Sequence, residues 1–194
     1  MARLETFAED LLSEKDIRHL APIRFGLMNE PVAINLFEEK TGLSSDKCGL
    51  FVMSENPYIG ASPDRIVVEG GVRKTVEVKC SYTLSKAKDP VQKEINERNL
   101  NQILELVDGR LSLRKSHDYY FQVQGQMLCA KTEETYFVVY NGVDIEYFIV
   151  KRDEEFIKSM LHKLKAFNKM VFRETVLTHF FYRDSADFSS LIDS

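Results

Sequence analysis

The sequence predicts an α/β (α+β) domain built on a central mixed β-sheet that helices flank. Three observations predict this class: apolar residues at helical spacing near both ends, short β-rich segments in the middle, and a strand pair joined by Asn141-Gly142. No internal repeat or linker divides the 194 residues. We therefore expect a single domain over residues 1–194. It would comprise a helical segment over about 1–22, a core over about 23–173 and a frayed C-terminal tail.

Two helices are predicted before the first strand. Residues 4–20 carry apolar side chains at helical spacing, and Pro22 follows them. A second helix is expected to begin at Pro31, because proline suits the first turn of a helix, and to end at Gly42. This places Glu30 at or just before the start of the second helix.

Residues 49–80 are predicted to form a strand meander. Its segments are rich in β-branched residues, and Asn56-Pro57 and Gly70-Gly71 mark the turns between them. In "TVEVKC", residues 75–80, alternation directs Glu77 and Lys79 to one face of the last strand. These two side chains should therefore project side by side.

After residue 80, elements are predicted for only part of the chain. Residues 81–101 are mostly polar and lysine-rich, and no element is assigned to them. A short hairpin is expected around Asp108-Gly109, followed by a helix capped by Ser116. The Asn141-Gly142 hairpin comes next, and the final helix should begin near Asp153.

Composition limits the function classes. Hydrophobic residues make up 44% and charged residues 29%, with a net charge of −4. That charge argues against a protein that coats nucleic acid through bulk positive charge, although carboxylates that hold metal ions in a nuclease would also add negative charge. No apolar run approaches the ~20 residues that span a bilayer. Three cysteines without paired spacing fit reduced thiols, so we expect an intracellular protein in a bacterial or infected-cell cytoplasm or a nucleus.

Two acidic residues and a lysine suggest a catalytic site. Asp64 follows Pro63 at the start of one strand, where a hairpin partner can bring it beside Glu77 on the next. Two carboxylates with Lys79 alongside suit Mg²⁺ or Mn²⁺, and the implied chemistry is metal-assisted phosphodiester hydrolysis. The alternative is an exposed Glu-x-Lys pair with an unrelated aspartate in a turn.

The order of four motifs resembles a known family. "SPD" (62–64) and "EVK" (77–79) are similar to the motif of the PD-(D/E)xK nucleases, which have a restriction-endonuclease-like fold. Upstream, "RFGLMNEPVAINLFEEKTG" resembles the glutamate-bearing helix of the lambda-exonuclease branch, the YqaJ-type viral recombinases. Downstream, "YYFQVQGQM" resembles the glutamine-bearing helix of that branch.

The resemblance implies roles for individual residues. Asp64, Glu77 and the backbone carbonyl of Val78 would bind metal, and Lys79 would position or activate the attacking water. Glu30 would add a carboxylate for a second metal ion or for orienting water. Alternatively, Glu30 is only a first-turn acid favoured by the helix dipole.

Gln122, the first glutamine of "QVQ", would by the same resemblance hold water or phosphate near the metal ions. Its alternative is an ordinary exposed glutamine on a helix. Gln124 and Gln126 are expected on other faces of that helix and are the weaker candidates.

DNA contacts are predicted at four positions. Arg24 is the candidate for a phosphate contact, Lys86 and Arg114 for a local basic path, and Ser62 for phosphate binding or a turn. Phage-type members of the family carry an arginine followed by a Gly-Gly-Ser segment well upstream, linked to the 5′ phosphate. This sequence has no such segment.

Taken together, the resemblance implies a Mg²⁺-dependent deoxyribonuclease with two metal ions, in which Mn²⁺ can substitute. The expected activity is 5′–3′ exonuclease digestion of linear double-stranded DNA in recombination or repair. Expected partners are DNA ends, a single-strand annealing protein and two further copies in a homotrimer, with no membrane. The alternatives are a structure-specific or nicking endonuclease and a non-catalytic DNA-binding module.

Overall fold

The computed structural model describes residues 2–13, 16–87 and 103–182. They group into two compact units, and each is described by itself. One unit spans Ile17–Ile157 and contains the sheet, whereas the other combines the segment up to Asp16 with the chain from Lys158 onward. The single-domain organisation stays a prediction. The predicted frayed tail, residues 183–194, lies outside the described residues.

A five-stranded sheet forms the centre of the larger unit. Its order is β1-β4-β5-β8-β9, and every neighbouring pair is antiparallel except β5 and β8, which are parallel. The mixed sheet predicted from the sequence is thus confirmed. The strands are β1 (Ser45–Asp46), β4 (Arg65–Glu69), β5 (Val72–Cys80), β8 (Glu134–Tyr140) and β9 (Ile145–Lys151).

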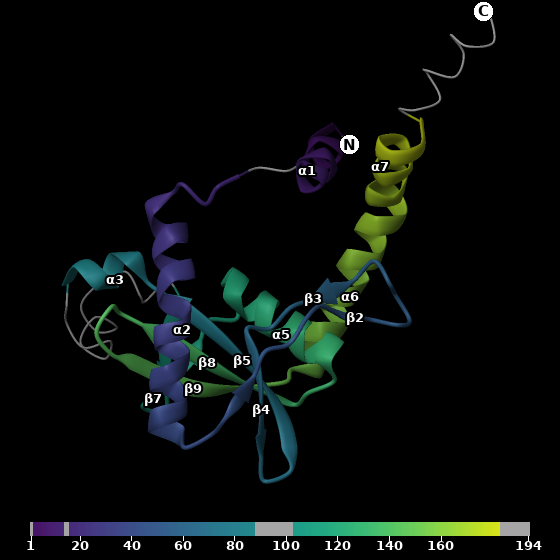
Figure 1. Cartoon of the computed structure of the whole chain (residues 1–194). Helices are drawn as coiled ribbons and strands as arrows, with labels where there is room; N and C mark the ends of the chain where they lie inside the picture. Colours follow the sequence, from purple (N-terminus) through teal and green to yellow (C-terminus); the bar gives the residue numbers. More distant parts are fainter. Residues whose placement is uncertain (1, 14–15, 88–102, 183–194) are drawn as a thin grey trace, which may run out of the picture. The chain divides into compact units, whose positions relative to one another are not determined.

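Two helices cover opposite faces of this sheet (Figure 1). Helix α2 (Ala21–Thr41) buries Ala33, Ile34 and Phe37 in a cluster that also contains Val76 and Val78 of β5. Helix α5 (Asp118–Ala130) buries its apolar stripe in the other cluster, with Phe137 and Val139 of β8. Alternation along β5 therefore sends its valines toward α2 and leaves its other face toward α5.

Helix α2 begins ten residues earlier than predicted. Pro22, not Pro31, occupies its first turn, and Pro31 lies inside the helix. Glu30 is therefore in the middle of α2 and not at its head. An interior proline costs about 3 kcal/mol, but packing of the buried face on the sheet outweighs local propensity.

Two small ribbons and a short helix complete the larger unit. Strands β2 (Phe51–Val52) and β3 (Gly60–Ala61) pair antiparallel and contact α5. Strands β6 (Leu104–Val107) and β7 (Arg110–Leu113) form the hairpin predicted around Asp108-Gly109. Helix α3 (Tyr82–Ala87) was not predicted, and the rest of the lysine-rich stretch, from residue 88, lies outside the described residues.

The cap of α5 differs from the prediction by one residue. His117, not Ser116, is the N-cap, and its Nδ1 accepts a hydrogen bond from the Tyr119 N–H at 3.1 Å. The start of α6 (Glu154–Phe167) agrees with the sequence, because Asp153 Oδ1 accepts from the Phe156 N–H.

The smaller unit is helical. Its elements are α1 (Ala2–Leu12), most of α6, two π-helical segments η2 (Asn168–Phe172) and η3 (Thr178–Tyr182), and α7 (Arg173–Leu177). The ring of Phe7 lies 5.7 Å from that of Phe167, and Ala8 is fully buried. Helix α1 ends before residue 20, where the sequence placed its end. None of the helices in the described part of the chain combines the length and apolar character that crossing a membrane requires.

Candidate active site

The register of the β4–β5 hairpin places Asp64 beside Glu77. Arg65 pairs with Val76 in the antiparallel register. The residue before Arg65 is Asp64 and the residue after Val76 is Glu77, so these two lie beside each other. The Asp64 N–H donates to the carbonyl of Val76 at 3.1 Å, and Asp64 Oδ2 accepts from the Val78 N–H at 2.7 Å. The aspartate is thus fixed to β5 through both main chain and side chain.

Glu77 is almost completely buried and bonded at both oxygens. Its Oε1 accepts from Lys79 Nζ at 2.5 Å and from Gln122 Nε2 at 2.7 Å. Its Oε2 accepts from Gln126 Nε2 at 2.7 Å. A carboxylate that is 2% exposed requires such partners, because burying an unpaired charge costs several kcal/mol.

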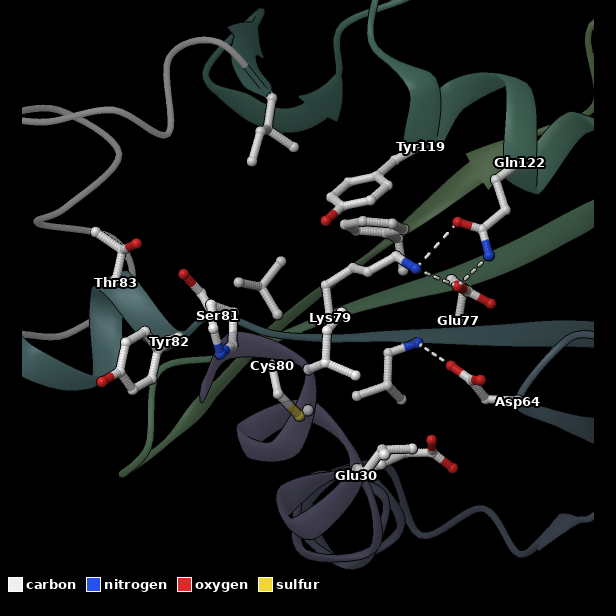
Figure 2. Close-up of a pocket in the computed structure, with 18 of the residues that line it drawn as sticks. Glu30, Asp64, Glu77, Lys79, Cys80, Ser81, Tyr82, Thr83, Tyr119 and Gln122 are labelled. Atoms are coloured by element: carbon white, nitrogen blue, oxygen red, sulfur yellow. Dashed lines mark hydrogen bonds and ion pairs between the residues drawn. The ribbon is translucent and has the colours of Figure 1, made fainter. Parts of the chain in front are cut away.

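Lys79 is held at three sides of its ammonium group. Besides Glu77, its Nζ donates to Gln122 Oε1 at 3.0 Å and lies 4.6 Å from the centre of the Tyr119 ring. Gln122 therefore connects Lys79 to Glu77, since its amide oxygen accepts from the lysine and its amide nitrogen donates to the glutamate. Figure 2 shows the lysine, the glutamate and the glutamine connected in this way.

Glu30 approaches the same region from α2 (Figure 2). Its Oε1 lies 3.7 Å from Nη1 of Arg65, which also donates to the carbonyl oxygen of Asp64 at 2.8 Å. Arg65 is not among the site residues predicted from the sequence. The guanidinium thus connects the glutamate of α2 to the main chain of Asp64, the residue before β4.

These side chains line one open cleft of about 540 Å³ between α2, β5 and α5. The acidic and basic groups occupy one part of it, and α2 contributes an apolar wall that includes Ile23 and Leu27. The predicted site residues that it contains are Glu30, Asp64, Glu77, Val78, Lys79 and Gln122. The convergence expected from the sequence is therefore present in the structure.

Burial and crowding of negative charge both raise pKa values in the cleft. Burial, and then the charge of Glu77, raise the pKa of Asp64 to about 7 from its ordinary 3.8, and Glu30 adds to the rise. Burial raises the pKa of the neighbouring Cys80 thiol to about 12. That thiol stays protonated and is a poor nucleophile or metal ligand.

The donor set fits a hard divalent cation in its chemistry. Carboxylate oxygens are the ligands Mg²⁺ prefers. A bound cation would offset both the burial of the Asp64 charge and its repulsion by Glu77, which together raise the pKa of Asp64. In a β-strand the N–H and C=O of one residue point to the same side, so the Val78 carbonyl faces the side of Asp64. Across the described ranges, no three His, Cys, Asp or Glu side chains gather closely enough to form a ready-made metal cage.

The prediction for Gln126 was wrong. It was assigned to a different helix face from Gln122, yet both bond the same carboxylate. Residues four apart share a helix face, so the spacing itself could have revealed this. Gln124 does lie elsewhere, where it bonds the main chain of Lys151 and Asp153.

The four predicted DNA contacts do not line the cleft. The side chains of Arg24 and Lys86 are exposed, and the ammonium of Lys86 lies over the ring of Tyr82. Ser62 is exposed in the short segment between β3 and β4. Arg114 pairs with Glu105 at 3.3 Å. Their roles stay predictions.

Comparison with known proteins decides the family. The model of the YqaJ-like viral recombinase domain matches residues 3–133. The chain belongs to this family. Glu30, Asp64, Glu77, Lys79 and Gln122 all lie inside the matched range, so the YqaJ-like assignment covers the candidate site.

Three solved structures similar to this YqaJ-like chain are those of exonucleases. LHK-Exo, an alkaline exonuclease from Laribacter hongkongensis, has 22% identity and a TM-score of 0.65, over 96% of this chain and 85% of that chain. Its complex with dAMP gives 21% identity with the same TM-score and coverage. A phage-related exonuclease from Haemophilus somnus 129PT has 17% identity and a TM-score of 0.58, over 92% and 82%. At these identities the likeness establishes the fold. A search of curated protein sequences gave no significant match.

Proposed function

We propose that this protein is a Mg²⁺-dependent deoxyribonuclease, and specifically a 5′–3′ exonuclease on linear double-stranded DNA that acts in recombination or repair. The observation that carries the proposal is the gathering of Asp64, Glu77 and Lys79 in one open cleft. Membership of the YqaJ-like family supports it, as does the similarity to LHK-Exo, which has been solved in complex with dAMP, a DNA mononucleotide. A homotrimer and an annealing partner stay predictions.

The acidic residues would hold the cation. Asp64, Glu77 and the Val78 carbonyl are the proposed ligands, and Glu30 is the candidate for a second ion. When bound, Mg²⁺ would stabilise negative charge on the phosphate and make water more acidic. The residue before β4 and the middle of β5 meet here, and both lie on hydrogen-bonded backbone, which favours a fixed geometry.

Lys79 and Gln122 would act on the water and the phosphate. The lysine ammonium can donate a hydrogen bond to the attacking water or to a phosphate oxygen as charge develops there. Gln122 holds that ammonium through its Oε1 at 3.0 Å and keeps it oriented from α5. The roles of acid, base and amide are thus distributed over one strand and one helix.

The test is digestion of duplex DNA labelled separately at its 5′ and 3′ ends, with and without Mg²⁺. We expect release of the 5′ label first, only with Mg²⁺, and a loss of at least about 100-fold in the Glu77→Ala variant, because the proposed ligand is removed. Lys79→Ala should lose turnover to a similar extent while it still binds Mg²⁺.

Two outcomes would contradict the proposal. Undiminished activity of Glu77→Ala would place the chemistry elsewhere, and early release of the 3′ label would reverse the polarity. Loss of Mg²⁺ affinity in Lys79→Ala, measured by calorimetry, would remove the assigned role of the lysine.

A further inference from the structure

Helix α5 carries two fully buried glutamines that differ in what they contact. Both ends of the Gln124 amide are bonded, to the carbonyl of Lys151 and the N–H of Asp153, each at 2.9 Å. Gln126 is 1% exposed, and its Oε1 has no hydrogen-bond partner in the described part of the chain. A buried acceptor without a partner costs about 1–3 kcal/mol, so its presence requires an explanation.

The carboxylate of Glu77 explains the orientation of the Gln126 amide. Nε2 donates to Glu77 Oε2 at 2.7 Å. The reversed amide would place its oxygen against the carboxylate oxygen, and Glu77 Oε2 would then lose the bond from Gln126. The unpaired acceptor is therefore the consequence of an amide that is turned to donate to Glu77.

The same nitrogen also reaches the segment that leads into Asp64. Nε2 of Gln126 lies 3.4 Å from the carbonyl oxygen of Ser62, two residues before Asp64. Gln126 thus connects Glu77 to the main chain that leads into Asp64. Gln122, one helical turn earlier, donates to the other oxygen of Glu77, so α5 fixes the carboxylate at both oxygens.

We propose that Gln126 is a positioning residue that holds the Glu77 carboxylate in the orientation that binds a divalent cation together with Asp64. This inference rests on the proposed function and adds a residue to it. A neutral amide suits the task, because it fixes the carboxylate without cancelling the charge that attracts the cation. Removing a partner that orients a metal ligand typically costs 10–100-fold in metal affinity or activity.

The experiment is calorimetric titration of Mn²⁺ into the full chain without DNA. Gln126→Leu keeps a similar volume but removes the donor, and we expect its Mn²⁺ dissociation constant to rise at least about 10-fold. Gln124→Leu is the matched control, since it removes an equally buried glutamine from the same helix. It should lower Tm and leave Mn²⁺ affinity within about twofold. Gln126→Asn, which withdraws the amide by one methylene, should also weaken binding and serves if the leucine variant does not fold.

The outcomes separate this inference from the one it rests on. Equal Mn²⁺ affinity of wild type and folded Gln126 variants would overturn the positioning role alone. Equal weakening by Gln124→Leu would also overturn it, because the effect would then be general loss of packing in α5. A wild-type protein that binds no Mn²⁺ would overturn the proposed function and this inference together.

Discussion

Asp64 carries an electrostatic cost in the metal-free protein. Its pKa is raised to about 7 by burial and by the nearby charge of Glu77, against an ordinary value of 3.8. Because the folded-state pKa lies above the unfolded-state value, the protonated carboxyl favours the fold. The stability that this group contributes is full below about pH 4 and is lost as the pH rises to about 7.

Asp64→Asn should therefore stabilise the metal-free protein at pH 8. Asparagine stays neutral and can still accept the Val78 N–H, so the cost of the buried charge disappears. We expect a Tm several degrees above wild type at pH 8, since each pKa unit corresponds to about 1.4 kcal/mol. At pH 4 we expect no gain, because Asp64 is then already protonated in the folded protein.

Thermal unfolding in chelator, and again in Mg²⁺, measures this effect. Mg²⁺ should raise the Tm of wild type at pH 8 but not that of the asparagine variant. A variant less stable than wild type at pH 8 would show that the aspartate is well accommodated as an anion and that the cleft is not strained by charge.

Individual side chains were predictable where the strand pattern alone fixes their direction. Alternation and a tight Gly-Gly turn were sufficient to bring Asp64, Glu77 and Lys79 together. Arg65 could not be placed opposite Glu30 in this way, because that contact depends on how α2 lies across the sheet. The local sequence determines the face of a strand to which a side chain points. It does not determine which helix residue that side chain contacts.

At the scale of elements, α2 shows why helix boundaries are hard to infer. Proline at position 31 is a reasonable start signal, but Pro22 carries the same signal nine residues earlier. The ring of Phe25, ahead of Pro31, stacks on Tyr140 of the sheet. Burial of this upstream turn favours the longer helix, and such a contact cannot be read from propensity.

The loop between β8 and β9 depends on Gly142. Its φ of 94° is unfavourable for other residues, and a Cβ there would lie 2.9 Å from Cβ of Ser85 in α3. In Gly142→Ala, the alanine should pay about 1–2 kcal/mol for the left-handed backbone and should additionally push α3 away. We expect the free energy of unfolding, measured in urea, to fall at least twice as much as in a control variant that has only the backbone cost.

The control is Gly71→Ala in the β4–β5 turn. Gly71 has a φ of 82°, but a Cβ there meets nothing within 4 Å, so only the backbone term changes. Equal losses in the two variants would mean that α3 yields freely and that its packing on the loop contributes little.

For the whole molecule, the order of elements and the mixed sheet followed from the sequence. Hairpin turns such as Asn141-Gly142 and Gly70-Gly71 have a specific backbone requirement, and the structure has positive φ at Gly70, Gly71 and Gly142. The grouping into two compact units did not follow, because the apolar stripe of α6 continues from one unit into the other without a change in pattern. Contacts between α1 and η2 join chain ends about 160 residues apart, and no local signal encodes such a contact.

The last prediction concerns which DNA the whole protein attacks. Lys79 is the sole basic residue among the described side chains that line the cleft, and the chain carries a net charge of −4. Weak attraction for the duplex backbone favours an enzyme that needs a strand end. With Mg²⁺, a linearised plasmid should therefore be degraded while the covalently closed form of the same plasmid stays intact, as agarose gels would show. Relaxed or linear products from the closed circle, absent with Glu77→Ala, would instead establish the nicking or structure-specific endonuclease.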